Sequence, residues 1–154
     1  SHGRTDAPRR ASEGQTKGRP GESVIALDTN VLVRFLIRDD ERQAERARAL
    51  IESCKSRGDS CLITHPVLCE LEWVMESLYR ASRTDILGAI RTLRTTPPFV
   101  LEDDSIVDRA LHMYSAGKGD LSDYILGEIA VARGARTTYT FDRGLRNAEG
   151  FTLL

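Results

Sequence analysis

The chain has 154 residues, 40% of them hydrophobic and 29% charged, with a formal net charge of −1. This length suits one domain with a hydrophobic core and is too short for two ordinary domains. No apolar run approaches the roughly 20 residues of a membrane helix, and no secretion signal opens the chain, so we expect a soluble, cytoplasmic protein without a membrane partner.

The first 22 residues differ in composition from the rest. They hold five basic and three acidic residues and contain no Leu, Ile, Val or aromatic residue, so they have nothing to bury in a core. We predict that residues 1–22 are a disordered tail or a segment not native to the protein, and that residues 23–154 form the domain. With 17 bases against 20 acids, that domain would need a local basic patch, or metal ions, to bind a nucleic acid.

The stretch V-I-A-L-D-T-N-V-L-V, residues 24–33, begins with the apolar pattern of a buried strand. It runs into Asp28, Thr29 and Asn30, polar residues that belong at a strand end. In an open parallel α/β sheet, ligands bind in the crevice beyond the carboxyl ends of the strands. We therefore expect Asp28 to lie in the functional site.

Strands and helices alternate along the rest of the chain. Apolar spacing, capping residues and turn residues predict the following elements: a helix capped by Asp39 or Asp40 and ending near Cys54, a strand at 60–63, a helix over 66–80, a helix from Ser82 to the Pro97-Pro98 pair, a strand at 99–101, a helix from Asp103 or Asp104 to Gly117, a helix opening at Asp120, a strand at 137–141 and a short closing strand at 151–154.

The helix over residues 66–80 carries three glutamates, which differ in their angle around the helix axis. The spacing predicts one apolar stripe, with Glu72 and Glu76 near the opposite, solvated face and Glu70 at the edge of the stripe. The stripe comprises Val67, Leu71, Val74, Met75 and Leu78. A carboxylate at the edge of a buried face needs a partner or a metal ion, so Glu70 is the functional candidate, although it can also simply point to water.

Three further acids lie near the C-terminus. Asp120 and Asp123 occupy the first turn of a predicted helix, where an acid also serves as an ordinary N-cap. Asp123 lies deeper in the helix beside apolar residues and is harder to explain as a cap. Asp142 directly follows the strand at 137–141, just as Asp28 follows the first strand.

The alternation predicts an α/β protein with three layers, α/β/α, around a central parallel sheet. Asp28, Asp123 and Asp142 would then meet at one edge of the sheet, and Glu70 would join them. Carboxylates gathered in one cleft suit Mg²⁺ or Mn²⁺, and one or two such ions support in-line displacement at a phosphoryl group. The three cysteines lack the spacing of zinc or redox sites, and no nucleotide-binding glycine motif occurs.

Four motifs resemble, in order and spacing, those of PIN-domain proteins, especially VapC-type toxins of type II toxin–antitoxin systems. They are A-L-D-T-N-V-L-V-R, V-L-C-E-L-E-W-V, G-D-L-S-D-Y-I-L-G-E-I-A and T-Y-T-F-D-R-G-L, and the resemblance covers about residues 24–153. Each motif alone is weak, whereas the ordered set is fairly specific. The D-L-S-D segment stands where many members have D-F-A-D, which leaves the acids unchanged.

The resemblance implies an endoribonuclease that uses Mg²⁺ or Mn²⁺ to cut structured RNA such as tRNA or rRNA, usually as a homodimer inhibited by a cognate antitoxin protein. It assigns catalysis and metal binding to Asp28, Glu70, Asp123 and Asp142, with Asp120 as an auxiliary acid. Asn30 and Thr140 match polar positions that steady those acids through hydrogen bonds.

Several arginines are candidates for contacts with RNA phosphates, although each is more often a solvated surface charge. They are Arg38, Arg80, Arg133, Arg143 and Arg146. Two other functions remain open. One is an inactive PIN module that only binds RNA or protein, which the presence of all four acids disfavours. The other is a metal-dependent phosphohydrolase for small molecules, which the lack of a D-x-D motif at Asp28 disfavours.

Overall fold

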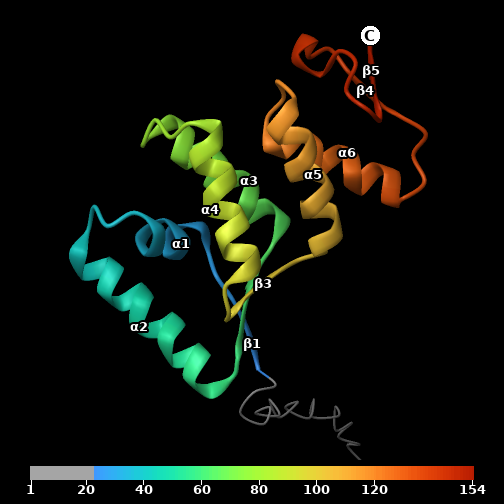
Figure 1. The fold of residues 1–154 in the computed structure, drawn as a ribbon. Coiled ribbons are helices and arrows are strands. Elements are labelled where there is room, and N and C mark those ends of the chain that lie inside the picture. Colours follow the sequence, from blue (N-terminus) through green and yellow to red (C-terminus); the bar gives the residue numbers. More distant parts are fainter. Residues whose placement is uncertain (1–22) are drawn as a thin grey trace, which may run out of the picture.

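The structure is a computed structural model that describes residues 23–154, and the prediction for residues 1–22 lies outside this range. In chain order (Figure 1) the elements are β1 (Val24–Ala26), α1 (Thr29–Leu36), α2 (Glu41–Arg57), β2 (Ser60–Ile63), α3 (His65–Ser77), α4 (Arg83–Thr95), β3 (Phe99–Leu101), α5 (Asp104–Ala116), α6 (Leu121–Ala132), β4 (Thr138–Thr140), the 3₁₀ turn η1 (Arg143–Leu145) and β5 (Phe151–Leu153). Within the described range, no helix is both long and apolar enough to cross a membrane.

The predicted class, a three-layer α/β/α fold on a parallel sheet, is confirmed. The main sheet has the order β1-β2-β3, and both of its pairings are parallel. The last two strands depart from the expectation of one sheet, because β4 and β5 form a separate parallel pair. Figure 1 shows this pair beyond α5 and α6, at the opposite end of the molecule from β1.

Packing on α6 explains the position of the β4–β5 pair. The ring of Phe151 on β5 meets Tyr124 of α6 edge to face, with 6.4 Å between the ring centroids. Leu145, which follows β4, is buried close to Gly119 and Tyr124. These apolar contacts fix the pair against the helix that precedes it in the chain, rather than against β1.

Helix α1 was not predicted: no element was expected between the end of the first strand at Asp28 and the helix capped by Asp39 or Asp40. Its start is visible in the sequence in hindsight. The Asp28 carboxylate accepts a hydrogen bond from the Thr29 backbone N–H at 2.7 Å and caps the helix. Leu32 and Val33 then face the core, where both are buried.

The prediction for the glutamates of α3 was partly wrong. Glu72 is only 3% exposed rather than solvated, whereas Leu78, assigned to the apolar stripe, is 67% exposed. The cause is tertiary: α6 begins against this side of α3, and its Leu121 backbone N–H donates to Glu72 Oε2 at 2.6 Å. A helix N-terminus accommodates a buried carboxylate because it offers N–H donors and a positive dipole.

Capping residues located several other helix ends correctly. Asp40 caps α2 through the Gln43 N–H, and Ser82 with Asp85 forms a complete capping box at α4. Gly117 ends α5 as expected. Local hydrogen bonding decides these boundaries, which is why a short sequence window was enough to find them.

The packing of β5 on α6 gives a direct test of this fold. A Cβ added at Gly127 of α6 would lie 2.6 Å from Cζ of Phe151, whereas a Cβ at Gly88 of α4 would meet nothing within 4 Å. We expect Gly127→Ala to lower the unfolding free energy by about 1–3 kcal/mol through overpacking. The matched Gly88→Ala variant should raise it by about 0.5–1 kcal/mol, since alanine favours a helix over glycine. Urea denaturation of both variants measures the difference, and equal effects would contradict the position of β5.

Candidate active site

Two of the predicted acids are joined through Thr29. Asp28 is exposed at the end of the β1 segment, and Thr29 next to it is buried. The Thr29 hydroxyl donates to Glu70 Oε2 of α3 at 2.7 Å. The start of α1 and the middle of α3 therefore present Asp28 and Glu70 as neighbours.

A second group of acids lies at the start of α6. The Asp120 backbone N–H donates to Asp123 Oδ2 at 2.9 Å in a capping box, so both acids also serve the ordinary capping role considered for them. Burial raises the pKa of the Asp123 carboxyl, and the nearby carboxylates of Asp120 and Asp142 raise it further.

Local turns position Asp142 after β4. Its backbone N–H donates to the Thr140 hydroxyl at 3.0 Å, and its Oδ1 accepts from the Gly144 N–H at 2.8 Å. The Thr140 hydroxyl thus holds the backbone of Asp142. This contact agrees in kind with the steadying role expected of Thr140, which stays a prediction for catalysis.

The thiol of Cys69 on α3 is influenced by acids of both groups. Burial raises the pKa of its thiol to about 11, and the charges of Glu72, Asp123 and Glu70 contribute in the same direction. One side chain thus senses acids from both groups, which indicates that α3 and α6 turn their acids toward a shared region.

The raised pKa of Cys69 predicts slow alkylation. At pH 8 its thiolate fraction should be about 100-fold below that of an ordinary thiol, so iodoacetamide should react slowly and faster as the pH approaches 11. Mass spectrometry of the labelled peptide measures the rate, with free cysteine as reference. Reaction at the rate of an ordinary thiol would show that burial and these carboxylates do not raise the pKa of Cys69.

The acids have the ligand chemistry that a divalent metal ion prefers, but their positions in the described part of the chain do not form a metal site. Carboxylate oxygens are the ligands that Mg²⁺ and Mn²⁺ prefer, and the carboxyl groups near Asp123 repel one another in a way that a cation would relieve. Within residues 23–154, however, no three histidine, cysteine or acidic side chains lie close enough to form a metal site. The Asp28–Glu70 pair and the Asp120–Asp123–Asp142 group therefore do not combine into such a site in this range.

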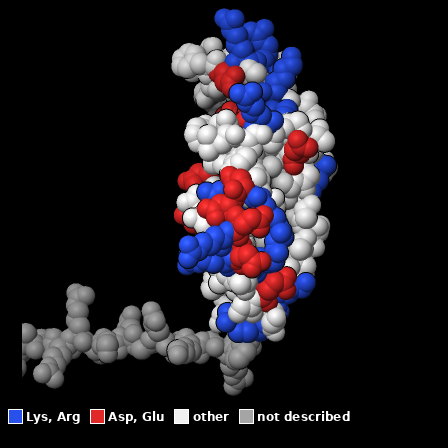
Figure 2. Space-filling view, turned by 90° about the vertical axis from the view of Figure 1, so that its left-hand side faces the viewer, with Lys and Arg blue, Asp and Glu red and all other residues white. Residues whose placement is uncertain are grey.

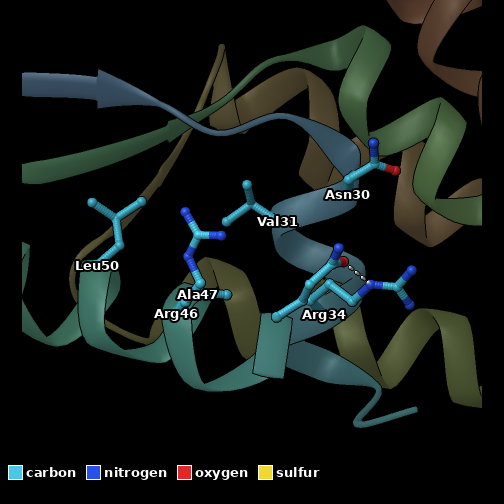
Figure 3. Close-up of a pocket in the computed structure, with 7 residues that line it drawn as sticks. Asn30, Val31, Arg34, Arg46, Ala47 and Leu50 are labelled. Atoms are coloured by element: carbon cyan, nitrogen blue, oxygen red, sulfur yellow. Dashed lines mark hydrogen bonds between the residues drawn. The ribbon is translucent and has the colours of Figure 1, made fainter. Parts of the chain in front are cut away.

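Asn30 lies at the end of a groove between α1 and α2, shown in Figure 3. The groove has a volume of about 370 Å³ and is otherwise lined by Val31, Arg34, Gln43, Arg46, Ala47 and Leu50. The Arg34 side chain is held by Gln43 at 2.7 Å and by Asp39 at 2.6 Å. The floor of the groove is apolar, and its rim carries Arg34 and Arg46. The groove therefore suits a partner with apolar and acidic groups.

The arginines predicted to contact RNA are all exposed, and they lie on different elements. Arg143 and Arg146 belong to the C-terminal part that follows Asp142. Figure 2 shows Lys and Arg gathered at the end of the molecule where Figure 1 places this part, whereas acids and bases alternate over the middle of that face. Basic charge therefore lies beside one acid of the candidate site.

Three residues of this region were not predicted from the sequence. Thr29 bridges two elements, Glu72 anchors the start of α6, and the thiol of Cys69 is influenced by acids of both groups. Only Thr29 had a local signal, since it follows the capping Asp28. The positions of the other two depend on how α6 packs against α3, which no short sequence window records.

Comparison with known proteins places these observations in a family. The profile of the family described as PIN domain matches residues 25–150. The chain is also similar to a VapC ribonuclease of Aquifex aeolicus (strain VF5), with 26% identity over 117 residues, which cover 76% of this chain and 86% of that protein.

Proposed function

This chain belongs to the PIN-domain family, and from that premise we propose that it is a Mg²⁺- or Mn²⁺-dependent endoribonuclease toxin that cleaves structured RNA such as tRNA or rRNA. The carrying observation is the Thr29 hydrogen bond that holds Glu70 beside Asp28, with a second acidic group at the start of α6. Similarity to a VapC ribonuclease supports the same activity. The activity would reside in residues 23–154 and act in the cytoplasm.

Four acids would hold the metal in this proposal: Asp28, Glu70, Asp123 and Asp142. A bound divalent ion supplies charge that stabilises the phosphoryl group during in-line displacement. The chain's own part is to orient these carboxylates. Thr29 fixes Glu70, the Asp120 N–H fixes Asp123, and the Gly144 N–H fixes Asp142.

RNA would approach from the side of Asp142, where Arg143 and Arg146 are exposed. Each arginine can neutralise a backbone phosphate and thereby offset the mildly acidic charge of the domain. The other candidates, Arg38, Arg80 and Arg133, are exposed elsewhere and would add to this field at longer range.

We further propose that an inhibitory antitoxin occupies the groove between α1 and α2. The groove ends at Asn30, two residues from Asp28, so a segment bound there reaches the candidate site. Its apolar floor and its two arginines suit a peptide that combines apolar anchors with acidic side chains.

The test uses purified protein, an Asp28→Asn variant and a labelled pool of tRNA and rRNA, with Mg²⁺, Mn²⁺ or EDTA. We expect the wild type to cut with either metal, and both EDTA and the substitution to reduce cutting by at least about 100-fold, because each removes part of the metal site. Equal cutting by both proteins would refute the proposal. So would activity that survives EDTA.

The same assay separates the two alternative functions. An inactive binding module would retain RNA in a filter-binding assay but leave it uncut in every condition. A small-molecule phosphohydrolase would release phosphate from p-nitrophenyl phosphate and leave RNA intact. The presence of all four acids supports the nuclease over the first, and the PIN family match supports it over the second.

A further inference from the structure

The loop between α5 and α6 carries a cation next to the candidate acids. Its sequence is G-K-G-D over residues 117–120, and Asp120 begins the acidic turn of α6. Lys118 is exposed, and within residues 23–154 its ammonium group forms no ion pair with a carboxylate. Lys118 was not among the residues predicted to contact RNA. A positive charge without an acidic partner therefore lies beside the candidate site.

Hydrogen bonds hold the backbone of this loop in place. The Arg83 guanidinium of α4 donates to the carbonyls of Tyr114 and Gly119, both at 2.8 Å, and lies 3.9 Å from the centroid of the Tyr114 ring. In addition, the Gly119 N–H donates to the Tyr124 hydroxyl at 2.9 Å. A fixed backbone lowers the entropy that a side chain on it loses when it binds a ligand. The loop is thus a preorganised support for Lys118.

The two glycines that flank Lys118 also fix the loop. A Cβ at Gly117 would collide with the Tyr124 hydroxyl, and a Cβ at Gly119 would lie 2.5 Å from Cδ2 of Leu145. No other residue type fits at either position without moving these neighbours. The loop therefore packs closely against α6 and η1 on both sides of Lys118, while the lysine itself is exposed.

Lys118 also lies close to the turn that holds Asp142. A Cβ at Gly144 would lie 3.5 Å from the Lys118 carbonyl oxygen and 3.1 Å from Asp142 Oδ1. The Gly144 N–H itself donates to that Asp142 oxygen at 2.8 Å. Lys118 is therefore near two of the predicted acids, since Asp120 follows two residues later in the chain and Asp142 lies across Gly144.

A phosphate group is the ligand that suits Lys118 at this place. An ammonium group is a compact charge with three donors, and it contacts phosphate oxygens without reading the base. The alternative role is an internal counter-ion that relieves the repulsion among the acids. A counter-ion would form an ion pair with one of them, and the structure of the described residues shows no such pair for Lys118. The charge is therefore available to a ligand from solution.

We propose that Lys118 binds a backbone phosphate of the RNA next to the phosphodiester held at the acids. This inference rests on the proposed nuclease function for the identity of the ligand. Lys118 fixes the position of the strand, and the hydrogen bonds from Arg83 fix the loop that carries it. The contact is independent of base sequence and adds one positive charge on the side of Asp142, where Arg143 is exposed.

The salt dependence of RNA binding tests this contact. In full chains that carry Asp28→Asn to prevent cutting, binding of labelled tRNA and rRNA is measured on filters over a salt series with Mg²⁺. We expect Lys118→Met to weaken binding about fivefold at low salt. It should also lower the slope of log Kd against log salt by about 0.7–0.9, the value for one phosphate contact. The affinities of the parent and the variant should converge at high salt.

Two further variants are matched controls. Lys55→Met removes the other lysine of the described range, which is exposed on α2 and lines a groove near the amino ends of β2 and β3, and it should leave affinity and slope unchanged. Lys118→Arg keeps the charge and should restore the slope. The melting temperature of Lys118→Met should stay within about 2 °C of the parent. A lower melting temperature with an unchanged slope would overturn the proposal, because Lys118 would then be a counter-ion of the acids.

The outcomes separate this inference from the proposed function. If the wild type leaves RNA uncut, the nuclease proposal fails, and the salt series still decides the phosphate contact. If the wild type cuts RNA but Lys118→Met and Lys55→Met have equal slopes, the contact at Lys118 is refuted. A parent chain that binds no RNA at low salt would refute both.

Discussion

Replacing Glu72 with alanine is expected to lower the unfolding free energy by about 2–3 kcal/mol, because the buried Leu121 N–H loses its acceptor. The Ser122 N–H, 3.5 Å from the second carboxylate oxygen, loses a weaker one. The site should suffer as well, since Asp120 and Asp123 lie in the turn that Glu72 anchors. Urea denaturation, followed by circular dichroism, measures the loss.

Glu72→Gln separates the hydrogen bond from the charge. Glutamine keeps one oxygen acceptor, and it removes a carboxylate whose pKa is raised by burial. We expect this variant to lie within about 1 kcal/mol of the wild type. If alanine and glutamine are equally harmless, the anchor between α3 and α6 is absent. If both are equally harmful, the charge rather than the acceptor matters.

Local signals predicted most of the elements. The Ser82–Asp85 capping box and Gly117 mark helix ends through bonds between residues close in the chain. The family resemblance was also found from the sequence, since its motifs occur in order, and the family profile confirms it. Motif residues identify a family because they depend on residue type and spacing, not on packing.

Packing decided the features that the sequence did not predict. The helical spacing that put Glu72 on a solvated face was right about the angle but lacked the neighbour, α6, that covers it. The alternation of strands and helices predicted one sheet, yet β4 and β5 stay on α6 through Phe151. The expectation that the acids meet at one sheet edge depended on that single sheet and stays a prediction. Asp123 is the most informative acid to change, because burial and the charges of Asp120 and Asp142 both raise its pKa.

Asp123→Asn is expected to change activity and stability in opposite directions. Asparagine is uncharged and holds a metal less well, so RNA cleavage should fall by at least about 100-fold. Its side-chain oxygen can still accept from the Asp120 N–H, so the capping box remains. The metal-free variant should be more stable than the wild type at neutral pH, because it removes a partly buried charge near Asp120 and Asp142.

The difference in stability between Asp123→Asn and the wild type should depend on pH. The raised pKa means that the folded protein binds the Asp123 proton more tightly than the unfolded chain does. The wild type therefore loses stability as the pH rises from the ordinary carboxyl pKa through the raised one, and the variant lacks that loss. Thermal unfolding without metal, over a pH series, should show the two curves converging at low pH and separating as the pH rises.

Mg²⁺ should reverse the order of stability of the two proteins, because it should stabilise the wild type alone. Binding to the folded state raises the melting temperature, and more so for a tighter ligand, so Mg²⁺ should stabilise the wild type and leave Asp123→Asn nearly unchanged. Glu76→Gln, a change of an exposed acid on α3, is the matched control and should respond to Mg²⁺ like the wild type. If Asp123→Asn keeps its activity, or gains from Mg²⁺ as the control does, Asp123 does not bind the metal. The raised pKa of Asp123 would then reflect only its place at the start of α6, without a catalytic role.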